Sequence, residues 1–195
     1  CDEVYEHLTY YDGASHIPLM TLPGMHERCI RISSAGKTFS MTGWKIGYSI
    51  GAPKLIEAAS KAHQFLTFTA PPNLQYAVAL GLKNEKEYFF NLGKDMKLKR
   101  DLLTNGLERI GFNVLRSEGT YFLVADYSPL GDFGRDIEFC KTLIKDAGVG
   151  AVPFSAFYQK GVNDRLNNFI RFCYCKKSDT LDTAINRLEK YFAAN

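Results

Sequence analysis

The chain has 195 residues, which is enough for one ordinary domain or for parts of two small ones. Its residues are 46% hydrophobic and 23% charged, a composition that excludes an intrinsically disordered chain. The net charge of +3 is weak and the basic residues form no dense block, so no nucleic-acid partner is expected.

Short strands and helices alternate in the first part of the chain. Residues 29–33 alternate and are partly β-branched, which predicts a strand, and residues 34–38 follow as a loop of small residues. A second strand is expected over 44–50. Prolines that begin or precede apolar runs then predict helices over 53–65 and 73–82. The connections are of the type found in parallel sheets.

Residues 85–110 have a long, charged and periodic pattern. The apolar positions that share one helical face are Phe89, Leu92, Met96, Leu103 and Leu107. A helix of this length often bridges two lobes. We therefore expect three parts: 1–84, the connecting helix 85–110, and a smaller domain 111–195.

After Gly111 the pattern predicts a smaller α/β unit. The strands expected here are 113–115, 121–127, 149–152 and 169–175. The expected helices are 137–147, which stops at Gly148, and 181–193, with Ser178 as its N-cap.

The chain contains five cysteines, an odd number without a regular framework. That usage indicates reduced thiols and a cytoplasmic setting. Cys173 and Cys175 would face the same side of a strand, but nothing nearby supplies the further ligands of a zinc site, so no metal is expected. No apolar run is long enough to span a membrane, and no signal peptide is recognised.

Lys37 follows a predicted strand and is flanked by small residues. It could be a solvated loop lysine, and a phosphate-binding P-loop is set aside because the first glycine of that motif is missing at the required distance. Ser34 lies three residues before it and Lys45 eight residues after it. A hydroxyl, an ammonium group and the backbone amides of a glycine-containing turn make a good anion site.

Three further residues could carry chemistry. Asp2 and Tyr5 lie near the start of the chain, at a strand end, where they could equally be structural. Arg171 lies between apolar residues in a predicted strand, and a buried arginine there needs an anionic partner. From the residues alone, that partner could be a structural carboxylate or a ligand.

Taken together, these stretches resemble the fold-type I, pyridoxal-phosphate-dependent aminotransferases of class I and II. The resemblance covers essentially the whole chain and is strongest for the subgroup of kynurenine, glutamine and methionine aminotransferases and cysteine-conjugate β-lyases. It is carried by residues 2–6 (Asp-Glu-Val-Tyr-Glu), 33–48 (Ser-Ser-Ala-Gly-Lys-Thr-Phe-Ser-Met-Thr-Gly-Trp-Lys-Ile-Gly-Tyr), 118–122 (Glu-Gly-Thr-Tyr-Phe) and 170–172 (Ile-Arg-Phe).

The resemblance implies an α/β fold: the C-terminal part of the cofactor-binding large domain, with a mostly parallel sheet, and the small C-terminal α/β domain of the aspartate aminotransferase fold. It also implies pyridoxal 5′-phosphate as cofactor, held by Lys37 as an internal aldimine. Asp2 would pair with the pyridinium nitrogen, and Tyr5 with the phenolic oxygen. Ser34 and Lys45 would bind the phosphate; many relatives have Arg in place of Lys45, although Lys is usual in this subgroup.

Arg171 would bind the α-carboxylate of the substrate. The implied reaction is transamination between an L-amino acid (methionine, glutamine or an aromatic or kynurenine-like one) and a 2-oxo acid, by a homodimer. A cysteine-conjugate β-lyase and a non-catalytic, ligand-binding regulator remain as alternatives. The family's glycine-rich phosphate cup and ring-stacking aromatic residue are not found in these 195 residues, so the chain by itself is expected to hold part of a site and to have weak or no activity.

Overall fold

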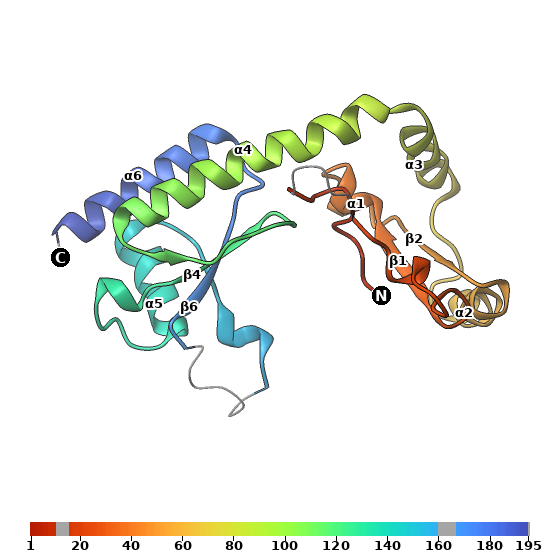
Figure 1. Ribbon diagram of the computed structural model, residues 1–195, viewed down its shortest axis with the longest axis horizontal. Coiled ribbons are helices and arrows are strands. Elements are labelled where there is room, and N and C mark those ends of the chain that lie inside the picture. The colour runs from red at the N-terminus through yellow and green to blue at the C-terminus, as the bar shows by residue number, and fades with distance from the viewer. Residues whose placement is uncertain (11–15, 160–166, 195) are drawn as a thin grey trace. The chain divides into compact units, whose positions relative to one another are not determined.

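The computed structural model describes residues 1–10, 16–159 and 167–194. The chain divides into two compact units, Cys1–Gly93 and Lys94–Asn195. Helix α4, Lys86–Ile110, is long enough to contribute to both units (Figure 1). Each unit combines strands with helices, as the α/β expectation requires. No helix among the described residues has both the length and the apolar character needed to cross a membrane.

The first unit is built on a pair of antiparallel strands. Strand β1, Ile30–Ser34, pairs with β2, Gly47–Gly51, and Ser34 lies opposite Gly47. The expectation of a mostly parallel sheet is not met in the described part of this unit, where the parallel pairing is a bridge between Asp2 and Ile32. The connection from β1 to β2 holds only a single helical turn and a 3-10 turn, so the chain returns at the same end of the pair.

Helices of the first unit begin where the prolines predict. Helix α2, Pro53–Leu66, and helix α3, Pro72–Asn84, both have proline in the first turn, which confirms the two predicted helices to within two residues at each end. The remaining elements are 3-10 turns and one short helix: η1 (Leu19–Thr21), η2 (His26–Arg28), α1 (Ala35–Thr38) and η3 (Thr42–Trp44).

A four-stranded antiparallel sheet forms the second unit, in the order β3-β4-β6-β5. Its strands are Asn113–Val114, Phe122–Asp126, Phe169–Cys173 and, for β5, Val152–Pro153. The strand predicted over 149–152 is wrong in position. Gly148 takes a left-handed conformation and the Val149 N–H bonds to Leu143 O at 3.1 Å, so this segment closes the preceding helix before the strand begins.

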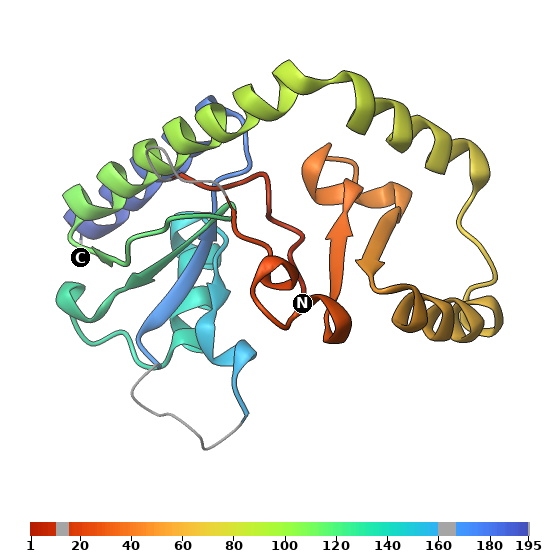
Figure 2. The same ribbon diagram turned by 45° about the vertical axis from the view of Figure 1, so that its right-hand side comes forward.

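Helices cover the buried face of this sheet. Burial alternates along β4 and β6, so that Leu123, Ala125, Ile170 and Phe172 form the inward face. Helix α5, Asp136–Thr142, continues as the π-helical turn η5, Leu143–Ala147, and α6, Ser178–Ala194, lies alongside the C-terminal part of α4 (Figures 1 and 2). Ser178 is thus the first residue of its helix rather than a cap before residue 181. Two 3-10 turns, η4 (Ser128–Leu130) and η6 (Phe154–Phe157), complete the unit.

An aromatic cluster joins the helices to the sheet. The Phe112 ring centre lies 5.9 Å from that of Phe172 in β6 and 5.7 Å from that of Phe192 in α6. Phe139 of α5 lies 6.4 Å from Phe192, and the Phe139 side chain is fully buried. Because such pairs add packing energy to a large buried area, this cluster is the core that holds the second unit together.

Gly106 of α4 lies in close contact with Ile185 of α6. A Cβ at this position would come within 2.6 Å of Ile185 Cδ1 and 2.9 Å of Ile185 Cγ2, and Ile185 is buried. Replacing Gly106 with Ala should therefore destabilise the protein: overpacking costs about 1–3 kcal/mol, which outweighs a gain in helix propensity of about 1 kcal/mol. The urea midpoint of unfolding, compared with that of the unsubstituted protein, measures the difference.

Gly93, in the same helix, provides a matched control. A Cβ added at this position would lie 3.7 Å from Thr9 O, an ordinary contact, so Gly93→Ala should raise stability by up to about 1 kcal/mol. A higher urea midpoint for Gly106→Ala than for the unsubstituted protein would contradict the close packing of α4 on α6. Adding Ile185→Val to Gly106→Ala should recover part of the loss.

Candidate active site

Lys37 lies in a single helical turn directly after strand β1. The sequence predicted a loop over 34–38, but Ser34 ends the strand and residues 35–38 form α1, in which Ala35, Gly36 and Thr38 are buried. The turn is held by the Phe39 N–H, which bonds to Ala35 O at 2.8 Å, and by the Ala35 N–H, which bonds to Ile46 O at 3.1 Å. Lys37 is half-exposed, whereas the other three residues of this turn are buried. Its side chain therefore extends outward from a well-packed turn.

Small residues are required around this turn. A Cβ on Gly36 would lie 3.1 Å from Thr42 Cα and 3.4 Å from Ser34 Oγ, so glycine lets the turn approach the 41–42 backbone. A cluster of apolar side chains packs around this turn. It consists of the buried residues Ala35, Ile46 and Val78, with Phe39, Met41, Ala70 and Leu74 packed against them. The small residues that flank Lys37 in the sequence are thus required by the packing of this turn.

The N-terminal segment places Asp2 beside β1 and Tyr5 near the Lys37 amine. Ile32 N–H bonds to Cys1 O at 2.8 Å and Glu3 N–H bonds to Ile32 O at 2.9 Å, which places Asp2 beside β1. The exposed Asp2 carboxylate accepts a bond from the Val4 N–H at 3.3 Å. Lys37 Nζ lies 5.8 Å from the centre of the Tyr5 ring, a distance at which a cation is attracted to the ring face.

A buried ionic network anchors this segment. Arg31 of β1 forms ion pairs with Glu3, at 2.9 Å from Nε, and with the buried Glu6. The Tyr48 hydroxyl of β2 donates to Glu6 Oε1 at 3.1 Å. The sequence alone did not indicate that Arg31, Glu3, Glu6 and Tyr48 position the N-terminal segment. Acidic residues on both sides of Val4 and Tyr5 were the available signal in the sequence, but their partner Arg31 is too distant in sequence to be inferred.

Glu3 shows how the network affects ionisation. Burial would raise its pKa, but hydrogen bonds from His16 (2.9 Å) and the Leu19 N–H (3.0 Å), with the charges of His16 and Arg31, outweigh burial and hold the Glu3 pKa below its usual value. The carboxylate therefore stays charged at neutral pH. It ties residues 16–19 to the segment that carries Asp2.

Lys45 lies in the tight connection between η3 and β2. Its backbone is left-handed (φ 56°, ψ 36°), an uncommon conformation for a residue with a side chain, and Lys45 itself is exposed. The next residue, Ile46, accepts the bond from Ala35, and Gly47 lies opposite Ser34. A Cβ on Gly47 would come within 2.9 Å of Ser33 O. This close crossing brings the backbone of Lys45 next to the Ser34–Lys37 turn.

Arg171 occupies the middle of the second unit's sheet. In β6 it lies opposite Val124 of β4 and Val152 of β5. Its guanidinium carbon lies 3.9 Å from the centre of the Phe122 ring and 4.3 Å from that of Phe157. Two aromatic faces so close hold the planar group in one orientation.

No acidic side chain of the described residues pairs with Arg171. Its Nε is buried and has no hydrogen-bond partner among the residues that the structure describes. A buried N–H needs an acceptor, so the unsatisfied Nε–H of this half-buried side chain points to a ligand with acceptor oxygens. The structural ion pair that the sequence left open is not found in this part of the chain.

Asp136 fixes the turn that carries Phe157. This fully buried carboxylate accepts bonds from the Ser155 N–H at 2.6 Å, the Ser155 hydroxyl at 3.0 Å and the Ile137 N–H at 2.9 Å. It thereby joins the start of α5 to η6. The sequence did not single out Asp136, because its partner lies in a loop whose path no local pattern predicts.

The predicted site residues thus fall in two places. Asp2, Tyr5, Ser34, Lys37 and Lys45 gather around the end of β1 in the first unit, and Arg171 lies in the second. Within the described ranges, no group of three His, Cys, Asp or Glu side chains could hold a metal ion.

Comparison with known proteins gives consistent results. The family profile described as "Aminotransferase class I and II" matches residues 1–188. The chain is 46% identical over 193 residues to a probable N-succinyldiaminopimelate aminotransferase of Mycobacterium tuberculosis, covering 96% of this chain and 48% of that protein. It is 39% identical over 189 residues to the methionine aminotransferase of Escherichia coli, covering 97% of this chain and 48% of that protein.

Solved structures agree with the fold. The N-succinyldiaminopimelate aminotransferase structure from M. tuberculosis superposes with a TM-score of 0.91 at 46% identity, over 97% of this chain and 48% of that one. A Thermus thermophilus aspartate aminotransferase variant gives 0.82 at 27% identity, over 97% of this chain and 47% of that one. The chain therefore spans about half the length of the curated relatives it matches.

Proposed function

The chain belongs to the class I and II aminotransferase family and has the aspartate aminotransferase fold, and on this premise we propose that it is part of an enzyme that transfers an amino group from an L-amino acid to a 2-oxo acid. The observation that carries the proposal is the setting of Lys37. Its side chain extends from the packed α1 turn toward Tyr5, and this turn directly follows the strand that pairs with Asp2.

Pyridoxal 5′-phosphate is the cofactor that this family implies, and the residues around Lys37 fit it. The glycine at position 36 leaves the space beside Ser34 Oγ that a Cβ would fill, and Lys45 adds a positive charge for a phosphate group. Asp2 supplies the negative charge for a protonated ring nitrogen, and Tyr5 a hydroxyl for the ring oxygen. When bound, the cofactor supplies an aldehyde and an electron-withdrawing ring that stabilises negative charge on the substrate.

Lys37 and the turn that carries it then have distinct roles. The Lys37 amine would hold the cofactor and would act as the base that moves the proton at the substrate Cα. A base must reach that carbon in a fixed geometry, which the packed α1 turn provides. Burial of Ala35 and Gly36 keeps the backbone of the turn in place while the lysine side chain moves.

Arg171 is proposed to bind the substrate carboxylate. A guanidinium presents parallel N–H groups that match the two oxygens of a carboxylate, and the rings of Phe122 and Phe157 keep its plane fixed. Its buried, unpartnered Nε supports a ligand rather than a structural role. Fixing the carboxylate in this way also restricts the orientation of the substrate Cα–H bond.

The amino donor is proposed to be methionine, glutamine or an aromatic or kynurenine-like amino acid. Relatives named as methionine aminotransferase and kynurenine–oxoglutarate transaminase, the latter from Dictyostelium discoideum at 41% identity, support this class. The 46% identical relative favours N-succinyldiaminopimelate as a second candidate substrate. The kcat/KM values for methionine, glutamine, kynurenine and N-succinyldiaminopimelate, each measured with 2-oxoglutarate as acceptor, show which of the two candidate substrate types the enzyme prefers.

Two further features of the whole protein are also proposals. A homodimer is implied by the family resemblance, and large exposed apolar side chains support a contact with more protein than this chain contains; they are Phe65, Leu66, Phe68 and Tyr76. A cytoplasmic location is supported by cysteines that are free where described.

A labelling experiment tests the lysine assignment. The full-length protein, incubated with pyridoxal phosphate and reduced with borohydride, should carry a stable label on Lys37 and little elsewhere, because the Lys37 amine extends from the packed α1 turn toward Tyr5. Peptide mapping by mass spectrometry gives the site. Label spread over surface lysines, with none on Lys37, would instead favour a non-catalytic relative that kept the fold.

A further inference from the structure

Two cysteines lie in contact at the end of strand β6. Cys173 is the last residue of the strand and Cys175 follows after Tyr174, and their sulfur atoms are 3.2 Å apart. Side chains two positions apart in an extended chain point to the same side. The Lys176 N–H bonds to Tyr174 O at 2.7 Å, a tight turn that fixes Cys175 at its centre.

The geometry allows the two sulfurs to be joined. A disulfide needs Cα atoms about 4.4–6.8 Å apart and sulfurs at about 2.05 Å, and two extended residues span about 6.6 Å. Starting from a sulfur separation of 3.2 Å, a small rotation of the side chains is enough. Cys173 is half-buried and Cys175 is exposed, so at least one thiol faces solvent.

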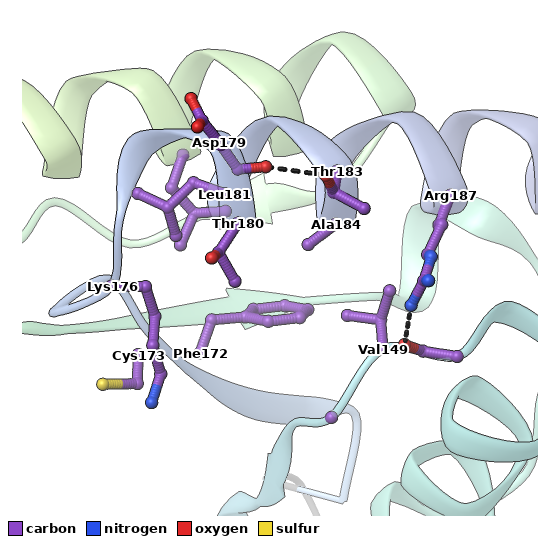
Figure 3. A pocket seen from close by; sticks show the side chains of 13 residues that line it. Val149, Phe172, Cys173, Lys176, Asp179, Thr180, Leu181, Thr183, Ala184 and Arg187 are labelled. Atoms are coloured by element: carbon purple, nitrogen blue, oxygen red, sulfur yellow. Dashed lines mark hydrogen bonds between the residues drawn. The ribbon is translucent and has the colours of Figure 1, made fainter.

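A cavity opens beside Cys173. It has a volume of about 640 Å³, and its walls come from β6, the segment 148–150, α4 and α6. Phe172, Val149 and Leu181 give it apolar sides (Figure 3). A cavity of this size accommodates a small molecule but not a protein surface.

The cavity also carries positive charge. Figure 3 shows Lys176 beside Cys173 and, at the other end, Arg187, which donates from Nη1 to Gly148 O at 3.0 Å. Asp179 is the acidic residue in the lining, so basic groups outnumber acidic ones. Carboxylate groups on a ligand would find positively charged partners here, in Lys176 at one end of the cavity and Arg187 at the other.

We propose that Cys173 and Cys175 form a dithiol site that is oxidised to an intramolecular disulfide by a small, carboxylate-bearing disulfide. The Cys173 thiolate attacks one sulfur of the ligand, which forms a mixed disulfide and releases the other half as a thiolate. The Cys175 thiolate then attacks the Cys173 sulfur, which closes the protein disulfide and releases the second half. Two protein thiols and one ligand disulfide become one protein disulfide and two ligand thiols, so two electrons pass to the ligand.

The second step should depend on pH. Although Cys175 is exposed at its surface, partial desolvation of its sulfur by the surrounding chain, together with the neighbouring Cys173 thiol, raises the pKa of Cys175 to about 11, and Lys176 acts in the opposite direction. Below that pH the thiolate fraction grows about tenfold per pH unit, because only the deprotonated sulfur attacks. Closure of the ring should therefore be about 100-fold faster at pH 9 than at pH 7.

Glutathione disulfide is the probe. The reduced full-length protein is mixed with it, quenched in acid at intervals, alkylated and mapped by mass spectrometry. We expect a peptide in which Cys173 and Cys175 are linked. In Cys175→Ser the mixed disulfide should instead accumulate on Cys173, because no second thiol is present to displace it. The neutral probe hydroxyethyl disulfide should react more slowly than glutathione disulfide.

Two controls make the result specific. Cys1→Ser removes the other close pair, in which the Cys1 and Cys29 sulfurs lie 3.5 Å apart, and should leave the reaction at Cys173 unchanged. Cys140 is buried and its pKa is raised to about 11, so it should react only after unfolding. The proposal is overturned by stable mixed disulfides in the unsubstituted protein, or by thiols at 173 and 175 that stay unreacted in the folded protein.

Discussion

Replacing Lys37 with alanine is expected to lower the kcat/KM for transamination by the full-length protein by a factor on the order of 10³ or more. The amine at this position is both nucleophile and proton carrier in the proposed mechanism, and the packed α1 turn aims no other amine from the same place. Steady-state rates with methionine, kynurenine and N-succinyldiaminopimelate measure the loss. Because Lys37 is half-exposed, the fold should survive the change, which a urea transition can verify.

Lys45 offers a control from the same region. It is proposed to contact only the phosphate, so Lys45→Ala should weaken cofactor binding while much of kcat is retained at saturating cofactor. Turnover by Lys37→Ala within tenfold of the unsubstituted enzyme, measured with cofactor bound, would be incompatible with the assigned role of Lys37. A similar loss of kcat in both variants would mean that the whole turn, rather than one amine, had been disturbed.

Replacing Arg171 with alanine should raise the KM for the amino acid by roughly 30-fold or more, because loss of one partner of a buried charge pair costs about 2–5 kcal/mol. The cofactor dissociation constant should change little, since Arg171 is proposed to contact substrate alone. Spectroscopic titration with cofactor and steady-state kinetics with amino acid measure the two effects separately.

Arg171→Lys separates charge from geometry. Lysine keeps the positive charge but lacks the planar fork that lies between the rings of Phe122 and Phe157, so its KM should fall between those of the unsubstituted enzyme and Arg171→Ala. Phe157→Leu should raise the KM by a smaller factor, because the guanidinium loses one of its two supporting faces. Equal losses of cofactor and amino-acid affinity in Arg171→Ala would make Arg171 a structural residue.

Local patterns were enough for much of the fold and for the choice of residues. Prolines at the start of α2 and α3, and the apolar stripe of α4, are signals that act within one or two turns of chain, and these helices form as predicted. The stretch from Ser33 to Tyr48 carries enough specific residues to indicate the family. These features depend on neighbours in the sequence, so a single chain without a structure reveals them.

Tertiary structure decided how those residues are held. The direction in which β2 pairs with β1 depends on the path of the short 35–46 connection, which no local pattern reports. The aromatic clamp on Arg171 joins residues that lie far apart in the sequence, as does the pairing of Arg31 with Glu3 and Glu6.

The sequence by itself therefore determined which residues could do chemistry, because residue type and spacing limit the reactions available to a chain. Only the tertiary structure decided that Lys37 extends from a packed turn and that Arg171 lacks an acidic partner in the described part of the chain. It also decided that the sulfur atoms of Cys173 and Cys175 lie in contact. Each of these is a property of contacts between side chains. Such contacts arise when the whole core packs, and their energies depend on burial that a linear pattern does not contain.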